Sequence, residues 1–332
     1  MAGPEGAARP LIAALGAGRM GRGMAVAFAY AGHPVHLIDA KPRGAGDAAR
    51  VADEAADEIR RTLAMMAGLG LLEPSEIGGI AVRVTLFGAD RLAEGLAGAS
   101  VIFEGVPETL AAKEDALGRA SALCDPQAII ASTTSTILST DLAPFVRHPE
   151  RFLNAHWLNP AFLVPLVEVS PTPQTDPQVT ARLNALLEGI GKVPVICAAS
   201  PGYIVPRLQI LAMNEAARMV EEGVATAEDI DRATRYGFGF RFAVLGLLEF
   251  IDWGGGDILY YASRYMTEAT GKDRFAAPEI IARNMEENRR GLRDGQGFLD
   301  YEGMDVPAYQ KARLGAFAAM LRHLDKLPVK GD

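Results

Sequence analysis

Residues 10–39 read PLIAALGAGRMGRGMAVAFAYAGHPVHLID, and the order of elements in this stretch decides the fold. The apolar residues 10–15 predict a short buried strand, and the glycine pattern G-x-G-x-x-G follows directly at residues 16–21. Residues 20–31 then predict a helix, and residues 34–39 predict a second strand that ends in an acid. Strand, glycine turn, helix, strand and terminal acid together are the signature of a βαβ unit that binds a dinucleotide.

Each glycine of such a unit has a physical role. Gly16 makes the tight turn, Gly18 lets the backbone approach a pyrophosphate, and Gly21 lets the helix pack on the strand. Asp39 falls about twenty residues after the glycines, where a carboxylate hydrogen-bonds the ribose hydroxyls of NAD and repels the 2′-phosphate of NADP. NAD is therefore the expected cofactor, although basic residues soon after this acid leave NADP open.

The remaining sequence predicts that this unit grows into an α/β domain and that a helical domain follows. Short apolar runs predict further strands as far as residues 193–198, separated by helical stretches such as the alanine-rich one at residues 44–72. After the last strand the pattern becomes helical, beginning with a long helix at residues 204–222. We therefore expect an α/β Rossmann-like dinucleotide-binding domain of residues 1–199 and an all-α C-terminal domain of residues 200–332.

Composition and charge narrow the class of protein. The 332 residues carry a net charge of −8 and no basic stretch interleaved with aromatic residues, so no nucleic-acid partner is expected. No apolar run reaches membrane-spanning length and no basic segment precedes the first one, so neither a membrane protein nor a signal peptide is expected. The five histidines and two cysteines have no metal-binding spacing, which predicts no metal site and reduced thiols in a cytoplasmic protein.

The candidate catalytic residues lie in the stretch RFLNAHWLNPAFLVPLVEVS of residues 151–170. A short apolar strand leads to His156, and a second apolar run at residues 163–169 carries a single acid, Glu168. The Asn-Pro turn signal between them lets the second strand fold back near the first. A carboxylate near an imidazole fixes its tautomer and raises its basicity, which suits a general base at neutral pH. The alternative is a solvated turn histidine and an edge-strand glutamate.

A run of hydroxyl residues marks the same edge of the predicted sheet. Residues 133–136, which include Ser135, come directly after the strand predicted at residues 128–132. Ligands bind at the carboxyl ends of strands in open parallel sheets, and His156 follows the next strand along the chain. The simpler explanation is an N-cap for the following helix, and the two roles are compatible.

The order of these landmarks resembles the 3-hydroxyacyl-CoA dehydrogenase family, over nearly the whole chain. The matching motifs are GAGRMG (16–21), VPET-x-x-x-K (106–113), ASTTS (131–135), H-x-x-NP (156–160), LVEV (166–169), GK-x-PV (191–195), PGYI (201–204) and GQGFLDY (295–301). The resemblance implies an NAD-dependent dehydrogenase that oxidises an L-3-hydroxyacyl group to the 3-oxo group. It also implies a dinucleotide-binding N-terminal domain and a helical domain that pairs two subunits into a homodimer.

Family roles pass to the residues of this sequence that match the family motifs. The resemblance makes His156 the general base, Glu168 its orienting carboxylate and Ser135 a hydrogen-bond partner of the substrate oxygen. Asn159 would line the nicotinamide side of the site. The implied cofactor-binding residues are Gly16, Gly18, Met20, Gly21, Asp39, Glu108 and Lys113.

Two departures from the family concern the substrate. The family motif PGF-x-x-NR offers an asparagine to the substrate, whereas PGYIVPRLQ has Pro206 there, with neither a polar side chain nor a backbone N–H. The segment LAMMAGLGL at residues 63–71 also lacks the lysines found in family members that act on CoA thioesters. Other motifs are closer to the branch that contains L-gulonate 3-dehydrogenase, lambda-crystallin and the carnitine dehydrogenases.

We therefore expect an NAD-dependent dehydrogenase acting on a CH–OH group of a small-molecule substrate, either a short 3-hydroxy acid or a 3-hydroxyacyl compound. The departures favour a free acid, and Arg241, which lies between aromatic residues, is the candidate partner of its carboxylate. An alternative for Arg241 is a charged group at a subunit interface. The alternative functions are a 3-hydroxybutyryl-CoA dehydrogenase and a non-catalytic, crystallin-like NAD-binding protein.

Overall fold

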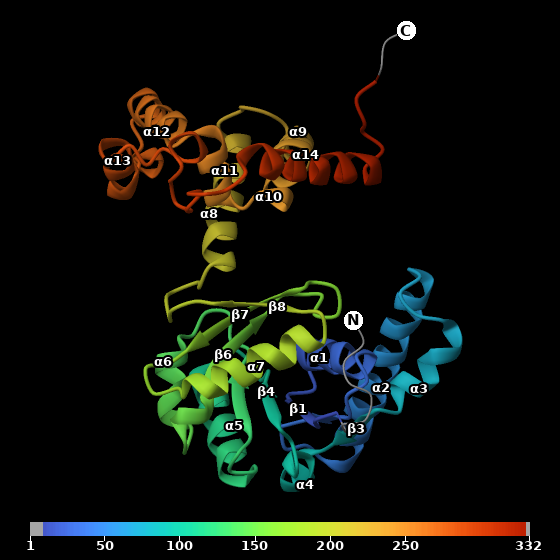
Figure 1. Cartoon of the computed structure of the whole chain (residues 1–332). Coiled ribbons are helices and arrows are strands. Elements are labelled where there is room, and N and C mark those ends of the chain that lie inside the picture. Colours follow the sequence, from blue (N-terminus) through green and yellow to red (C-terminus); the bar gives the residue numbers. More distant parts are fainter. Residues whose placement is uncertain (1–8, 330–332) are drawn as a thin grey trace. The chain divides into compact units, whose positions relative to one another are not determined.

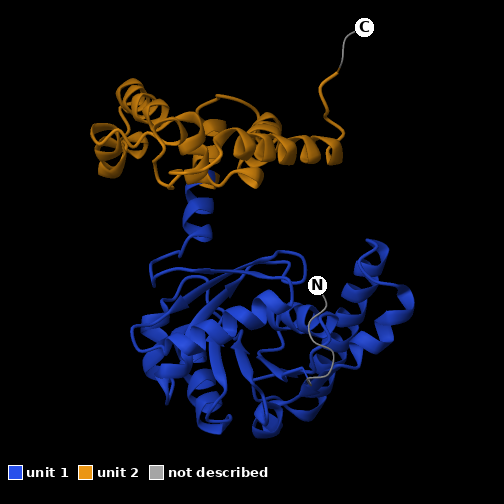
Figure 2. Ribbon diagram, viewed as in Figure 1, with its two compact units in different colours: residues 1–212 blue, residues 213–332 orange. Residues whose placement is uncertain are grey.

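The computed structural model describes all but the first eight and last three residues, so the outer ends of both predicted domains lie outside the described part. The chain forms two compact units, residues 1–212 and 213–332 (Figure 2). Helix α8 (Val205–Glu221) contains the point of division, so one continuous helix carries the chain from the first unit into the second. The domain boundary expected after residue 199 falls just before this helix and stays a prediction.

The first unit is built around one eight-stranded sheet (Figure 1). Its strands lie in the order β3-β2-β1-β4-β5-β6-β7-β8, and every neighbouring pair is parallel except β6 and β7. The strands are β1 (Ile12–Leu15), β2 (Val35–Ile38), β3 (Val84–Phe87), β4 (Val101–Glu104), β5 (Ile129–Ser132), β6 (Phe152–Trp157), β7 (Leu166–Pro171) and β8 (Val193–Ile196). The main helices are α1 (Arg19–Tyr30), α2 (Ala45–Gly68), α3 (Ile77–Ala81), α4 (Leu92–Leu96), α5 (Leu110–Leu123), α6 (Ser139–Leu142) and α7 (Pro177–Gly189). This is the Rossmann-like α/β arrangement predicted from the sequence.

The central strands β1, β4 and β5 are fully buried because helices cover both faces of the sheet there. All four residues of β1 are buried. Ile12 and Ala14 belong to one hydrophobic core, which α1 and α2 complete, while Ala13 and Leu15 belong to the other, which α4 and α5 complete. Strands buried on both faces read as continuous apolar runs rather than alternating ones, which is why short runs identified them in the sequence.

Strand direction brings the polar residues at the strand ends to one edge of the sheet. The parallel strands β1, β2, β4, β5 and β6 all end there, so the glycine loop, Asp39 and His156 lie along the same edge. Strand β7 runs in the opposite direction and begins at that edge. Its register with β6 sets Glu168 directly opposite His156. The predicted return of the second apolar run beside the first is therefore confirmed.

The second unit is helical. Apart from two isolated bridges within residues 291–300, no strand occurs among its described residues. Its main elements are α9 (Ala227–Ala233), the π-helical segment η5 (Thr234–Gly239), α10 (Phe240–Val244), α11 (Leu247–Gly254), α12 (Gly256–Thr270), α13 (Glu279–Glu286) and α14 (Val306–His323). No helix within residues 9–329 is both long and apolar enough to cross a membrane.

A buried carboxyl group holds the loop between α13 and α14 in place. Asp252, which is 2% exposed, accepts hydrogen bonds from the backbone amides of Phe298 and Leu299 at 2.9 and 2.8 Å, and from the Tyr301 hydroxyl at 3.2 Å. A Cβ atom at Gly297 would lie 2.1 Å from an Asp252 carboxylate oxygen, so only glycine fits. The motif GQGFLDY therefore has a structural role, because its backbone wraps around a buried carboxyl group that would be costly to leave without hydrogen-bond partners.

Candidate active site

The glycine loop between β1 and α1 has the geometry that a dinucleotide pyrophosphate requires. Gly16 has a φ of +118°, and a Cβ atom there would lie 2.6 Å from the carbonyl oxygen of Gly105. A Cβ atom at Gly21 would lie 1.9 Å from the Gly16 carbonyl oxygen, whereas one at Gly18 would meet nothing within 4 Å. No side chain caps the start of α1, so its first amides are free to bind an anion. The loop therefore fits NAD.

A pocket of about 890 Å³ opens beside this loop. Its size is that of a typical ligand site. Gly16, Gly18 and Asp39 line it together with the segment after β4 and the N-terminal half of α5. Five basic side chains also line it: Arg22, Lys41, Arg43, Arg50 and Arg119. The acids Glu54 and Asp115 line it as well, and each of the four arginines is ion-paired with an acid. The pocket thus joins the predicted phosphate loop to the predicted ribose-binding acid.

Asp39 is placed at the end of β2 by a backbone hydrogen bond of 2.9 Å from its amide to the Phe87 carbonyl. Its carboxylate accepts hydrogen bonds from Arg43, by Nε to one oxygen and by a second nitrogen at 3.4 Å to the other. This ion pair lies at the surface, where such pairs contribute little. The carboxylate can therefore exchange part of the pair for ribose hydroxyls.

The two candidate catalytic residues form a buried pair. His156 Nδ1 lies 2.7 Å from Glu168 Oε2, and the two residues are 5% and 1% exposed. The other carboxylate oxygen, Oε1, accepts hydrogen bonds from the backbone amides of Ile204 at 2.9 Å and Val205 at 2.7 Å. Both oxygens of Glu168 are thus satisfied. In the tautomer that donates an Nδ1 proton to this carboxyl group, Nε2 is left as the acceptor.

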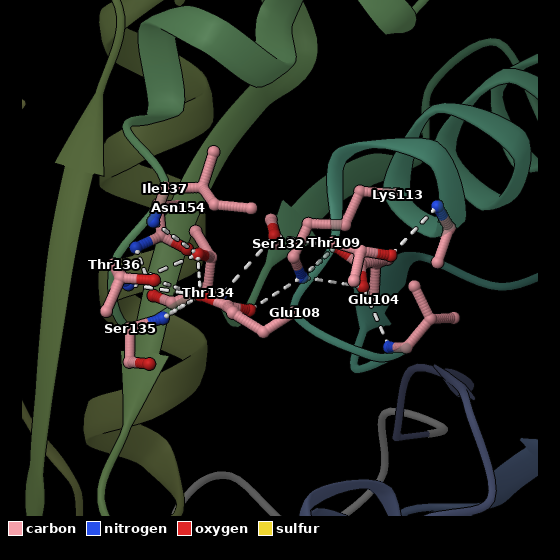
Figure 3. A network of polar contacts seen from close by, with 12 residues as sticks. Glu104, Glu108, Thr109, Lys113, Ser132, Thr134, Ser135, Thr136, Ile137 and Asn154 are labelled. Carbon is pink, nitrogen blue, oxygen red and sulfur yellow. Dashed lines mark hydrogen bonds and ion pairs between the residues drawn. The ribbon is translucent and has the colours of Figure 1, made fainter.

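Glu108 gathers the run of hydroxyl residues that follows β5 (Figure 3). Its Oε1 accepts hydrogen bonds from the amides of Ser135 at 3.0 Å and Thr136 at 3.1 Å, and from the hydroxyls of Thr134 and Thr136. Partial burial raises the pKa of Glu108, but these donors and the Lys113 ammonium outweigh it and hold the pKa at about 2. Glu108 is therefore an anion at neutral pH, and it fixes the backbone that carries Ser135.

The N-cap interpretation of this hydroxyl run is wrong. The N-cap of α6 is Leu138, and no side chain caps that helix. Instead, the Thr134 hydroxyl accepts from the amide of Ile137 at 2.9 Å, which closes a local turn. The hydroxyl residues thus shape the loop itself.

Lys113 is buried beside Glu108 and does not line the pocket next to the glycine loop. Its side chain is 1% exposed, and Nζ lies 3.1 and 3.2 Å from the two oxygens of Glu104 and 3.3 Å from Glu108 Oε2. Glu104, the last residue of β4, also accepts from the Val106 amide at 2.8 Å and the Ser132 hydroxyl at 2.6 Å. Sequence reasoning missed Glu104, although an acid ending the apolar strand VIFE was a signal. A direct contact of Lys113 with the cofactor stays a prediction.

The segment between β6 and β7 is held by Lys192. Its ammonium donates to the carbonyls of Ala161 at 2.5 Å and Val164 at 2.7 Å, and it lies 5.3 Å from the centre of the Trp157 ring. Burial lowers the pKa of Lys192 to about 8. Asn159 lies exposed in this segment, beside the site but without a hydrogen bond to His156. The motif GK-x-PV thus anchors the backbone around the predicted nicotinamide-side residue.

Three further candidates have clear positions. Met20 is half-buried in the first turn of α1 and packs against the core, so it contributes to the loop through packing. Pro206 is the second residue of α8, and its missing N–H follows the two amides that bind Glu168. In the second unit, Arg241 Nε donates to the Gly237 carbonyl at 3.0 Å, and its guanidinium carbon lies 4.9 Å from the centre of the Phe250 ring. Its partnership with a substrate carboxylate stays a prediction.

No group of three or more His, Cys, Asp or Glu side chains within residues 9–329 is arranged to hold a metal ion. The described residues place a buried imidazole–carboxylate pair at the sheet edge that also bears the glycine loop.

Comparisons with known proteins bear on this site. The family model for the 3-hydroxyacyl-CoA dehydrogenase NAD binding domain matches residues 11–200, and that for the C-terminal domain matches residues 202–301. The chain is 31% identical over 315 residues to a 5-formyl-3-hydroxy-2-methylpyridine 4-carboxylate 5-dehydrogenase of Mesorhizobium japonicum, covering 95% of the chain and 98% of that protein. It is 34% identical over 266 residues to a lambda-crystallin homolog of Bos taurus, covering 80% of each. The crystal structure of a 3-hydroxyacyl-CoA dehydrogenase of Archaeoglobus fulgidus matches with a TM-score of 0.74 and 28% identity, covering 96% of the chain and 100% of that structure.

Proposed function

The chain belongs to the 3-hydroxyacyl-CoA dehydrogenase family, and we propose that it interconverts the 3-hydroxy and 3-oxo forms of a small free carboxylic acid. It is an NAD-dependent oxidoreductase that acts on a CH–OH group. The observation that carries the proposal is the buried His156–Glu168 pair, 2.7 Å apart, at the sheet edge that also bears the dinucleotide loop.

In the proposed reaction His156 moves the proton. With its Nδ1–H donated to Glu168, the imidazole presents Nε2 as an acceptor for the substrate hydroxyl proton. The imidazolium that results is stabilised by the Glu168 carboxylate, which two backbone amides keep in place. NAD, when bound, supplies the acceptor for the hydride that leaves the carbon bearing this hydroxyl group. Ser135 is the proposed hydrogen-bond partner of the substrate oxygen, since Glu108 fixes its backbone.

Residues of the first unit are proposed to hold the cofactor. The glycine loop and the uncapped start of α1 would bind the pyrophosphate, and Asp39 the adenosine ribose. Glu108, ionised and next to Ser135, would lie on the nicotinamide side with Asn159. These assignments are supported by the pocket that joins the loop to Asp39.

Two features support a free acid as the substrate. The last turn of α2 and the residue that follows the helix expose apolar side chains where phosphate-binding lysines would be needed: Met65 is 49% exposed and Leu69 is 59% exposed. The Mesorhizobium japonicum relative is named for a pyridine carboxylate. Arg241 is the proposed carboxylate partner, because among the described residues its guanidinium donates a hydrogen bond through Nε alone, to the Gly237 carbonyl, so both terminal nitrogens can face a carboxylate.

A substrate panel tests this function. We expect NADH formation, followed by absorbance, with one or more short 3-hydroxy acids and much lower kcat/KM with 3-hydroxybutyryl-CoA. Efficient turnover of the CoA thioester alone would place the protein with the CoA-dependent members, in keeping with the archaeal structure. NADH binding without turnover of any compound would favour a crystallin-like role, the second candidate, which the Bos taurus relative supports.

We also propose a homodimer. Helices α8, α10 and α14 bury none of their residues within one chain, and exposed apolar side chains in this region include Met213, Phe238, Tyr261, Tyr265 and Leu314. A group of large apolar side chains left exposed on one chain is typical of a surface that a partner covers. A second copy is the partner that family membership favours. Light scattering should give twice the chain mass at micromolar concentration, and a monomer mass would contradict the proposal.

A further inference from the structure

Tyr203 has an unusual backbone. Its φ is 45°, in the left-handed region that favours glycine, and it follows Gly202, whose φ is +74°. The Tyr203 amide donates to the Ser200 carbonyl at 2.9 Å, which closes the turn. The side chain is only 3% exposed. A bulky residue held in a left-handed conformation indicates that its side-chain contacts outweigh the backbone strain.

Those contacts reach two parts of the candidate active site. The Tyr203 ring stacks on the His156 imidazole, with ring centres 6.2 Å apart and planes inclined by 24°. Its hydroxyl donates to the Ile137 carbonyl at 2.9 Å, at the end of the loop that carries Ser135. The backbone amides of the next two residues, Ile204 and Val205, donate to Oε1 of Glu168, the carboxylate oxygen that does not face His156. One turn of the chain thus contacts the proposed base, its carboxylate partner and the substrate-side loop.

We propose that Tyr203 is a positioning residue, which fixes the plane of the His156 imidazole and ties it to the Ser135 loop. This inference rests on the proposed role of His156 as the base. The bond from Nδ1 to Glu168 anchors one atom of the imidazole, and the ring can still tilt about that bond. A stacked aromatic face blocks the tilt, and the hydroxyl bond to Ile137 prevents the aromatic ring from moving with it.

Tyr203 is not itself a proton carrier in this scheme. Burial raises the pKa of the Tyr203 hydroxyl well above its usual range, and a neighbouring thiol, Cys197, adds to the shift. The hydroxyl therefore remains a protonated donor to Ile137 throughout the working pH range.

Two substitutions in the full-length enzyme separate the ring from the hydroxyl. Tyr203→Phe keeps the stacked ring and removes the hydroxyl bond, whereas Tyr203→Leu removes both. Tyr30→Phe is the matched control, because the Tyr30 hydroxyl also donates to a backbone carbonyl, that of Leu71, at 2.7 Å, far from the site in sequence. The measurements are kcat and KM for the substrate found in the panel, the pH profile of kcat/KM, NADH affinity by fluorescence, and the NMR signals of the His156 imidazole.

We expect kcat to fall about threefold to tenfold in Tyr203→Phe and about thirtyfold to a hundredfold in Tyr203→Leu, because small misplacements of a reacting group are costly. NADH affinity should not change, the acid limb of the pH profile should move, and the His156 signals should shift or broaden. Tyr30→Phe should match the wild type in all of these. If both Tyr203 variants lose only thermal stability, with kcat and the His156 signals unchanged, the positioning role is overturned.

Separate measurements test the role of His156 as the base and the role of Tyr203 in positioning it. Retained turnover in His156→Gln would show that the base is another group. The NMR signals of the His156 imidazole, measured without substrate, would still decide whether Tyr203 holds that ring. Unchanged signals in both Tyr203 variants would overturn the inference, and altered signals would support it.

Discussion

Replacing Glu168 by glutamine leaves the shape of the side chain and changes the hydrogen bonds that it can make. The carboxylate accepts from three donors: His156 Nδ1 at one oxygen, and the amides of Ile204 and Val205 at the other. A carboxamide offers one acceptor and one NH₂ donor. In either orientation the NH₂ group therefore faces at least one group that was donating to Glu168.

The energies of the two orientations decide the outcome. If the NH₂ group faces Ile204 and Val205, two part-buried amides lose their acceptor, at about 1 kcal/mol each. If it faces His156, a single imidazole can respond by moving its proton to Nε2, so this orientation is favoured. The base then presents N–H to the substrate and cannot accept a proton. We expect kcat to fall about 10²-fold to 10⁴-fold, the range for loss of a positioned general base.

The loss in the free energy of unfolding should be smaller than the rise in the activation free energy that the fall in kcat represents. In the favoured orientation the amides of Ile204 and Val205 keep an acceptor but lose its charge, so the free energy of unfolding should decrease by about 1–2 kcal/mol. Denaturant unfolding, NADH affinity and steady-state kinetics should be measured together, with the exposed Glu114→Gln as control. A variant of Glu168 with wild-type kcat and wild-type stability would refute the reasoning.

Four further outcomes are expected. His156→Gln should lower kcat at least about a hundredfold while NADH affinity, measured by fluorescence, stays unchanged. Asp39→Ala should reduce the preference for NAD over NADP in titrations of both cofactors, and equal affinities in the wild type would contradict the assignment of Asp39. Arg241→Lys should raise KM for a free acid with a smaller change in kcat, whereas the exposed Arg235→Lys should change neither. The folded-state pKa of Glu108 is about 2, below the ordinary 4.5, so its ionised form stabilises the fold above pH 4.5 and this contribution is lost as pH falls through 2. Glu108→Gln should therefore lower stability at pH 7, by about 1 kcal/mol after allowance for solvent screening, and flatten acid unfolding below pH 4.5.

The sequence contained the signals for the dinucleotide unit and for the strand pair. Glycine spacing after an apolar run predicted the loop, and a single acid in the second apolar run predicted the partner of His156. Both signals are carried by residue identity. The register that sets Glu168 opposite His156 then follows from the antiparallel return of β7.

Other parts of the site left little trace in the sequence. The amides of Ile204 and Val205 bind Glu168 through the backbone, which every residue except proline shares, so no side chain announces the contact. Lys113 matches a family motif, yet burial beside Glu104 depends on how α5 packs under β4. The stacking of Tyr203 on His156 likewise depends on a left-handed turn, which tyrosine does not predict.

The hydrogen bonds from the amides of Ile204 and Val205 to Glu168 limit where this chain can be joined to a relative in a hybrid protein. A hybrid protein joined at residue 199 would take its proton-transfer pair from one parent and the turn that braces the pair from the other. A junction placed inside α8, after Pro206, would keep both with the same parent. The helical half of the chain is therefore exchangeable as a module only when the turn at residues 201–206 travels with the sheet.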